Sequence, residues 1–241
     1  MRFLSVQHLR AYDAAAIASG IPGAVLMERA GYAAFLFLTR VAAPHARRFL
    51  IVTGKGNNAG DAFVVARYLL RAGCQVTLLP SVPADALRDD ALANWRALER
   101  LMSSARELPA IMSIPERIRA WQGDVIVDGL LGTGLQGDVC EEYRAIIEAI
   151  NARAIPVLAL DVPSGLNGDT GTPCGTAIRA TWTVTFGHAK RGMLEPASTE
   201  FCGRVEVIDI GLERGMPDDA APYTCQCLSA CEAQELLPRR M

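Results

Sequence analysis

Two glycine-rich segments, each directly after an apolar run, contain the polar side chains best suited to bind a small ligand. The run at residues 50–53 is followed by GKGNNAGD (residues 54–61), and the run at residues 125–127 by DGLLGTGL (residues 128–135). A β-branched run that ends in glycines and leads into a helical pattern is how an α/β sheet builds a phosphate-binding site. The pair therefore predicts a nucleotide-like ligand at the carboxyl ends of parallel strands.

The glycines alone are weak evidence for this site. Gly54, Gly56 and Gly60 would let backbone N–H groups approach an anion. Their spacing matches neither the dinucleotide fingerprint nor a P-loop, because no Gly-Lys-Ser/Thr follows. A simple tight turn remains the alternative.

The polar residues beside the glycines are more specific. Asn57, Asn58 and Asp61 follow an apolar strand end, where polar groups are costly to bury without a partner, and a ligand would supply one. Asp128 and Asp161 each directly follow a predicted central strand, so they are expected to face the binding crevice. Capping of a helix or turn is the alternative for both aspartates.

Oxygen donors dominate this set once Ser164 is included, three residues after Asp161 in a Pro-Ser-Gly turn. Asn, Asp and Ser oxygens suit a hard, weakly held cation such as an alkali ion rather than zinc. Lys190 follows a later strand and could reach a phosphate or carboxylate, although a surface lysine is an alternative. His188 is a lone histidine, for which a structural role is favoured over catalysis.

The elements that must position these residues alternate between helices and strands. Apolar periodicity predicts helices over residues 5–19, 22–41, 61–72, 85–102, 114–121 and 141–151, and short apolar runs predict strands over residues 48–53, 75–79, 124–128, 156–160, 180–186 and 204–208. Such alternation indicates an α/β fold with a mostly parallel, doubly wound sheet. The polar, proline-containing segment 213–222 predicts a linker or tail.

Composition excludes some partners. The 241 residues include 24 basic and 26 acidic residues without a basic block, so no nucleic-acid partner is expected. No apolar run could span a bilayer and the first residues lack a signal-peptide core, so we expect a cytoplasmic protein without a membrane partner. The seven cysteines form no Cys-x-x-Cys pair and are expected to be free thiols; Cys225, Cys227 and Cys231 are a weak metal candidate.

Five ordered motifs make the interpretation specific. GKGNNAGD, DGLLGTGL, ALDVPSGLNGDTG, VTFGHAKRG and GRVEVIDIGL, preceded by LMERAG at residues 26–31, resemble the NAD(P)H-hydrate epimerase family, also called the YjeF N-terminal domain. The resemblance covers about residues 5–212, which sets the expected domain at residues 1–212. Residues 213–241 would be a tail or linker, whose end (residues 236–240) resembles the entry to the dehydratase domain of bifunctional members.

The resemblance implies a Rossmann-like three-layer αβα sandwich, usually a homodimer, that interconverts the R and S epimers of NADHX and NADPHX. It also implies fusion to, or cooperation with, an NAD(P)H-hydrate dehydratase, and one potassium ion per subunit. By motif, Asn58, Asp128 and Ser164 would ligate potassium. Asp161 is the candidate catalytic acid/base, because it lies at a strand end in the expected crevice. The hydrated cofactor would contact Asn57, Asn58, Ala59, Gly60, Asp61, Gly132, Thr133, Gly134, Leu135, Gln136, Gly137, Asp138, Asp161 and Lys190.

One position departs from the family pattern. Ala62 stands where the motif usually has its last glycine. If that position needs a positive φ, alanine would cost about 1 kcal/mol; if it lies early in a helix, alanine is well tolerated. The rival functions are a non-catalytic binding or scaffold module of the same fold and a nucleotide kinase, the latter disfavoured by the missing P-loop lysine.

Overall fold

A six-stranded parallel sheet forms the centre of the molecule. The computed structural model describes residues 2–102, 112–212 and 225–226. The strand order is β3-β2-β4-β5-β6-β8, and every neighbouring pair is parallel. The strands are β2 (Arg48–Thr53), β3 (Gln75–Pro80), β4 (Val125–Gly129), β5 (Val157–Leu160), β6 (Trp182–Phe186) and β8 (Arg204–Ile208). The α/β fold with a parallel sheet is thereby confirmed.

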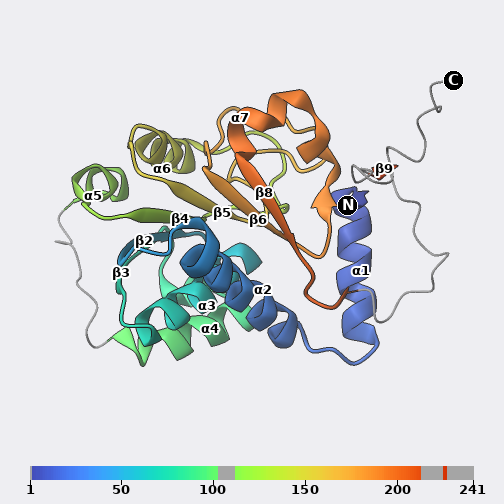
Figure 1. The fold of residues 1–241 in the computed structure, drawn as a ribbon, viewed down its shortest axis with the longest axis horizontal. Helices are drawn as coiled ribbons and strands as arrows, with labels where there is room; N and C mark the ends of the chain where they lie inside the picture. The colour runs from blue at the N-terminus through green and yellow to red at the C-terminus, as the bar shows by residue number, and fades with distance from the viewer. Residues whose placement is uncertain (1, 103–111, 213–224, 227–241) are drawn as a thin grey trace, which may run out of the picture.

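Helices cover both faces of the sheet because its central strands are apolar on both sides. Phe49 and Ile51 of β2 belong to the core shared with α1 (Val6–Ala18), α2 (Gly23–Phe37), α3 (Asn57–Arg71) and α4 (Asp89–Glu99). Leu50 and Val52 point the other way, into the core shared with α5 (Ile114–Ala120) and α6 (Glu141–Asn151). Figure 1 shows the resulting three layers.

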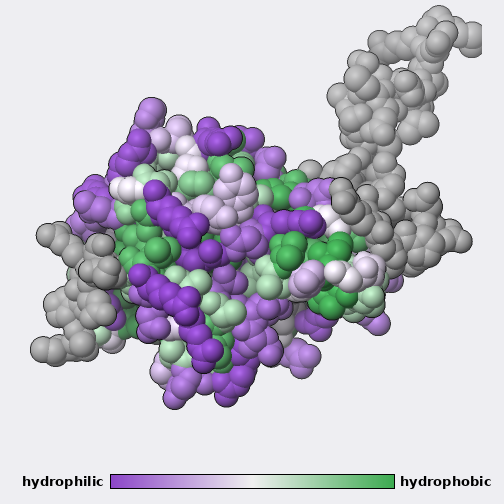
Figure 2. Space-filling view, turned by 90° about the horizontal axis from the view of Figure 1, so that it is seen from below, coloured by the Kyte–Doolittle hydropathy of each residue, from purple (hydrophilic) through white to green (hydrophobic). Residues whose placement is uncertain are grey.

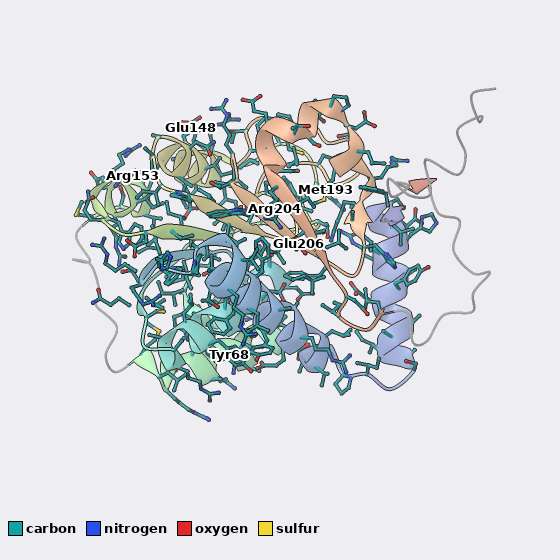
Figure 3. The ribbon with its side chains drawn as sticks, viewed as in Figure 1. Tyr68, Glu148, Arg153, Met193, Arg204 and Glu206 are labelled. Carbon is teal, nitrogen blue, oxygen red and sulfur yellow. The ribbon has the colours of Figure 1, made fainter. Side chains whose placement is uncertain are left out.

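The labelled side chains make the two faces easy to follow. Tyr68 on α3 and Glu148 on α6 lie on opposite sides of the sheet (Figure 3). At the edge of the sheet, the guanidinium of Arg204 on β8 lies 5.9 Å from the centre of the Phe37 ring of α2. The surface seen from below Figure 1 is largely hydrophilic with separate hydrophobic areas (Figure 2). No described helix is long and apolar enough to cross a membrane.

A second, smaller sheet lies beside the first. Its order is β7-β1-β9, formed by β7 (Ala189–Lys190), β1 (Arg2–Leu4) and β9 (Cys225–Gln226). The sequence reading missed β1 and β7, because two or three residues are too few to show a period. The remaining short elements are η1 (Leu38–Ala42), a π-helical extension of α2, with η2 (Ala84–Ala86), η4 (Arg191–Leu194), η5 (Pro196–Ser198) and α7 (Thr199–Cys202).

This small sheet sets the position of α1. Helix α1 follows β1 directly, and the Ser5 hydroxyl caps it by accepting a hydrogen bond from the backbone N–H of His8 (3.3 Å). The backbone N–H of Val6 also donates to the Asp169 carboxylate (2.9 Å). These contacts hold the helix against one end of the central sheet.

The N-termini of two predicted helices are misplaced by four residues. Helix α3 begins at Asn57 rather than residue 61, because Gly56 is extended and residues 57–60 form the first turn. Helix α4 is shorter than residues 85–102, because Leu87 is extended and Asp89 has a φ of 46°.

The backbone N–H groups of Gly54 and Gly60 already have partners within the protein, so they are not the groups that would contact an anion; the general prediction that the glycines let the backbone approach one stays a prediction. The N–H of Gly54 donates to Gly129 O (3.2 Å), and that of Gly60 donates to Gly56 O (3.3 Å). Packing requires glycine at position 54, where a Cβ would lie 2.0 Å from Leu130 O; a Cβ on Gly60 would lie 2.5 Å from the end of the flexible Met27 side chain, which would have to shift.

Ala62 lies early in α3, as the second alternative for this position predicts. The Ala62 Cβ packs directly against Gly129: a Cβ added to Gly129 would lie 2.5 Å from it. The expected tail (residues 213–241) lies outside the described residues except for β9, and so do Cys227 and Cys231.

Candidate functional site

A cavity of about 610 Å³ opens at the carboxyl end of the central sheet, a size typical of small-molecule sites. The chain runs from β2 outward to β3 and then returns to the other side of β2 as β4. Ligands of open α/β sheets bind at such a switch point. The lining comes from α1, the start of α2, residues 55–58 with Asp61, residues 130–136, and Asp161, Phe186 and Lys190.

Asn58, Asp128 and Ser164 are brought together through the loop after β4. The Ser164 hydroxyl donates to Asp128 Oδ1 (2.5 Å), and the Ser164 N–H donates to Asp128 Oδ2 (2.8 Å). The Leu131 N–H donates to Ser164 Oγ (2.8 Å), and Asn58 Nδ2 donates to Leu131 O (2.8 Å). Three strand ends are thus tied into one polar cluster.

This polar cluster offers unsatisfied acceptor capacity. Asn58 Oδ1 is buried and accepts no hydrogen bond from the described residues. Asp128 is fully buried, and burial raises its pKa to about 6 although hydrogen bonds from Ser164 and Leu130 oppose the shift. It has no ion pair with a described Lys or Arg. A buried carboxylate beside an orphaned amide oxygen and a hydroxyl is a donor set that a hard cation would satisfy.

Asp161 lies at the end of β5 in an unusual backbone conformation. Its φ is 64°, a left-handed value that aspartate tolerates better than most residues and that often marks functional sites. Its N–H donates to Val184 O (2.7 Å), which keeps the bend attached to β6. The bend places the carboxylate among the lining residues of the cavity.

Lys190 pairs with Asp161 inside the protein. Its ammonium donates to Asp161 Oδ1 and to the Thr185 hydroxyl (2.7 Å), with Phe186 O at 3.4 Å. The residue is 2% exposed, so the surface-lysine alternative is wrong. Its register opposite Leu4 in the small sheet fixes its backbone.

Two more carboxyls face the same cavity. Burial raises the pKa of Asp61 well above its usual value, and the charges of Asp161 and Asp13 raise it further. Burial likewise raises the pKa of Asp13 to about 6, with a further rise from Asp161 and an opposing effect of Lys190. Three carboxyls and one ammonium therefore share one region of low solvation.

The other predicted ligand-contact residues divide into two groups. Asn57, Gly132, Thr133, Gly134, Leu135 and Gln136 line the cavity together with Asn58, Asp61, Asp161 and Lys190. Ala59, Gly60, Gly137 and Asp138 lie outside this lining. Ala59 is fully buried in the core between α3 and the sheet. His188 is buried with its ring edge-on to Tyr12, 5.5 Å between centres.

The family follows from a comparison that covers most of the described chain. Residues 23–192 match the model for the YjeF-related protein N-terminus. The chain belongs to this family. Among YjeF-related proteins, the NAD(P)H-hydrate epimerase of Rhodopirellula baltica is 36% identical over 210 residues, 87% of this chain and 84% of that protein. The NAD(P)H-hydrate epimerase of Lentilactobacillus buchneri is 37% identical over 81% of this chain and 87% of that protein.

Other YjeF-related matches are longer or more distant. The bifunctional NAD(P)H-hydrate repair enzyme of Coxiella burnetii is 41% identical over 86% of this chain, and the chain spans about two fifths of that enzyme. The crystal structure of yeast ynu0 superposes with a TM-score of 0.68 at 20% identity, covering 80% of this chain and 83% of the other, which supports the fold.

The sequence reading missed the wall of this YjeF-related cavity that α1 provides. Leu9, Arg10, Asp13 and Ile17 line it, and the Arg10 guanidinium donates to Thr133 O (3.0 Å) across the opening. The available signal was a polar Asp13 directly beside the buried Tyr12, at the border of the apolar face. The apolar periodicity of α1 identifies the edge of its buried face, but it does not show that this edge faces a cavity.

Proposed function

We propose that the protein is an NAD(P)H-hydrate epimerase, an isomerase that interconverts the R and S epimers of NADHX and NADPHX. The observation that supports it best is the ion pair of Asp161 and Lys190 at a cavity large enough for a ligand, at the switch point of a YjeF-related fold. Two epimerases that cover most of this chain support the activity.

A potassium ion would fit the cluster of Asn58, Asp128 and Ser164. The orphaned Asn58 Oδ1, the buried Asp128 carboxylate and the Ser164 hydroxyl are oxygen donors of the kind that an alkali ion takes. When bound, the ion would supply positive charge beside the ligand's phosphates and hold the loop after β4. The chemical step is assigned to other residues.

Asp161 is the residue proposed to act on the reacting carbon. Epimerisation breaks the C–O bond of the hydrated carbon while the ring nitrogen forms a C=N bond, and water then adds to the opposite face. The Asp161 carboxylate, oriented by Lys190, would accept the proton of the incoming water. Its negative charge would stabilise the positive charge of the iminium-like species.

The deciding experiment follows R-to-S conversion of purified NADPHX by NMR, after subtraction of the spontaneous rate. Asp161→Asn should lower the enzymatic rate at least about 100-fold, the usual value of a lost acid/base group, whereas Asp85→Asn, on the exposed η2 turn, should leave it unchanged. Replacing potassium chloride by choline chloride should lower both the rate and the melting temperature. A wild-type protein that binds NADPHX without any exchange would favour the alternative, a non-catalytic binding or scaffold module.

We also propose that the protein is a cytoplasmic homodimer that works with an NAD(P)H-hydrate dehydratase. Exposed Val25 and Tyr32, seven residues apart on α2, supply apolar side chains on one helix face for a dimer contact, which sedimentation would test. Cys74, Cys140, Cys174 and Cys202 are free thiols, which agrees with a reducing compartment. Microscopy of a tagged chain would test the location.

A further inference from the structure

The proposed epimerisation needs a proton donor in addition to Asp161. The hydroxyl leaves the reacting carbon as water only if an acid protonates it. Asp161 is already ion-paired with Lys190, which suits a base rather than an acid. Lys190 is a poor donor to a ligand, because its ammonium faces Asp161, Thr185 and Phe186 O and the side chain is 3% exposed.

We propose that Asp13, on α1, is the second proton-transferring residue of this site and protonates the hydroxyl that leaves the ligand. The inference rests on the proposed epimerase function. Asp13 lines the cavity, and the residue is solvent-accessible although the surrounding protein partly desolvates its carboxyl, so a bound ligand can reach it. It comes from a helix outside the central sheet, whereas Asp161 comes from the end of β5, so the two carboxyls enter from different elements.

A buried, unpartnered carboxyl beside Asp13 independently points to a ligand here. Asp61 is 8% exposed and lines the cavity, and no described residue donates a hydrogen bond to its side chain. A polar group held in this way takes its partner from water in the cavity or from a bound ligand. Burial raises the pKa of Asp61 well above its usual value, which favours a role as hydrogen-bond donor, whereas the pKa of Asp13 is raised to about 6, which suits proton exchange.

Charged and titratable groups surround Asp13 on several elements. Those that interact with it or line the same cavity are Arg10 on α1, Lys55 before α3, Asp61 on α3, Asp90 on α4, Tyr143 on α6, Asp161 after β5 and Lys190 on β7. Asp161 favours the protonated form of Asp13, and Lys190 opposes it.

The step balances without a further reactant. The Asp13 carboxyl gives its proton to the leaving oxygen, which takes the C–O electron pair and departs as water while the nitrogen lone pair forms the C=N bond. Water then attacks the other face, its oxygen forms the new C–O bond, the C=N pair returns to nitrogen, and Asp161 takes the released proton. Exchange with solvent through the open cavity then removes the proton from Asp161 and returns one to Asp13, which restores both groups.

The test compares Asp13→Asn, Asp13→Glu and Asp61→Asn with wild type in the NADPHX exchange assay across about pH 5 to 9. The surface variant Asp85→Asn serves as a matched control for the loss of one carboxyl. Asp13→Asn should lower the rate at least about 100-fold and remove the fall in rate as pH rises past the Asp13 midpoint. Asp13→Glu should keep that fall and part of the rate. NADPH binding, followed by fluorescence, should change less than about threefold.

The possible results distinguish a failure of the epimerase function from a failure of the role assigned to Asp13. An inactive wild type would refute the epimerase function itself. An active wild type with Asp13→Asn within about threefold of its rate, or with an unchanged pH profile, would overturn the role of Asp13 alone. If Asp61→Asn removes the fall in rate at rising pH and Asp13→Asn does not, Asp61 is the proton donor to the leaving hydroxyl. That result would also overturn the role of Asp13.

Discussion

Removing the ammonium of Lys190 should destabilise the protein strongly and in a pH-dependent way. Lys190→Met keeps the length of the side chain but leaves Asp161 without its cation and Thr185 Oγ1 without its donor. Breaking a buried ion pair by removing one partner costs about 3–5 kcal/mol. Because the Asp161 side chain is 20% exposed, we expect a destabilisation at the lower end of this range, about 3 kcal/mol near pH 8.

The sign of the pH dependence follows from the neighbouring carboxyls. The pKa values of Asp13 and Asp61 are higher in the folded than in the unfolded protein. Their contribution to the free energy of unfolding is therefore present below about pH 4 and is lost as the pH rises through their folded-state pKa values. Lys190 lowers both pKa values, so its removal raises them further. The free energy of unfolding of Lys190→Met should therefore fall more steeply between about pH 5 and pH 8 than that of wild type.

Urea unfolding followed by tryptophan fluorescence measures this effect. The double variant Lys190→Met with Asp161→Asn should recover about 2 kcal/mol relative to the sum of the single changes, because the unpaired charge is gone. A cost below about 1 kcal/mol near pH 8, an equal cost near pH 5, or strict additivity in the double variant would refute the reasoning.

Two further predictions concern residues packed against the loop after β4. Gly54→Ala places a Cβ 2.0 Å from Leu130 O, so the loop after β4 must move; we expect about 3 kcal/mol of destabilisation by urea unfolding, and a loss below about 0.5 kcal/mol would contradict the packing. Ser164→Ala removes the hydroxyl that links Asp128 to the Leu131 N–H; we expect about 2 kcal/mol of destabilisation in choline chloride and a smaller stabilisation by potassium, and an unchanged potassium effect would separate Ser164 from the cation.

Local patterns were sufficient to predict the central sheet. The apolar runs at β2 and β8 have the observed bounds, because a strand buried on both faces reads as a continuous apolar segment. The GNNAG segment misled because its glycines indicate a loop, whereas Gly56 ends the extended chain and residues 57–60 already form a helix. Glycine in a sequence does not distinguish a turn from a close contact between packed elements.

The site was predictable where a residue follows a strand, and not where tertiary packing decides its environment. Asp128 and Asp161 lie at strand ends, and the parallel sheet brings such ends together. The burial of Lys190 depends on its pairing with β1, almost two hundred residues away in sequence, and Asp13 reaches the cavity because β1 anchors α1. No local pattern encodes either contact.

The attachment of α1 has a consequence for how such a protein changes over evolutionary time. The wall of the cavity formed by Arg10 and Asp13 belongs to a helix that the small sheet anchors, whereas the lining residue Leu130 is packed closely against the backbone at Gly54, and Gly129 against Ala62. Substitutions at those two glycines disturb folding. Substitutions on one side of α1 alter the shape and charge presented to a ligand while the folding core is kept. New ligand preferences are therefore expected to arise first in the first twenty residues of the chain.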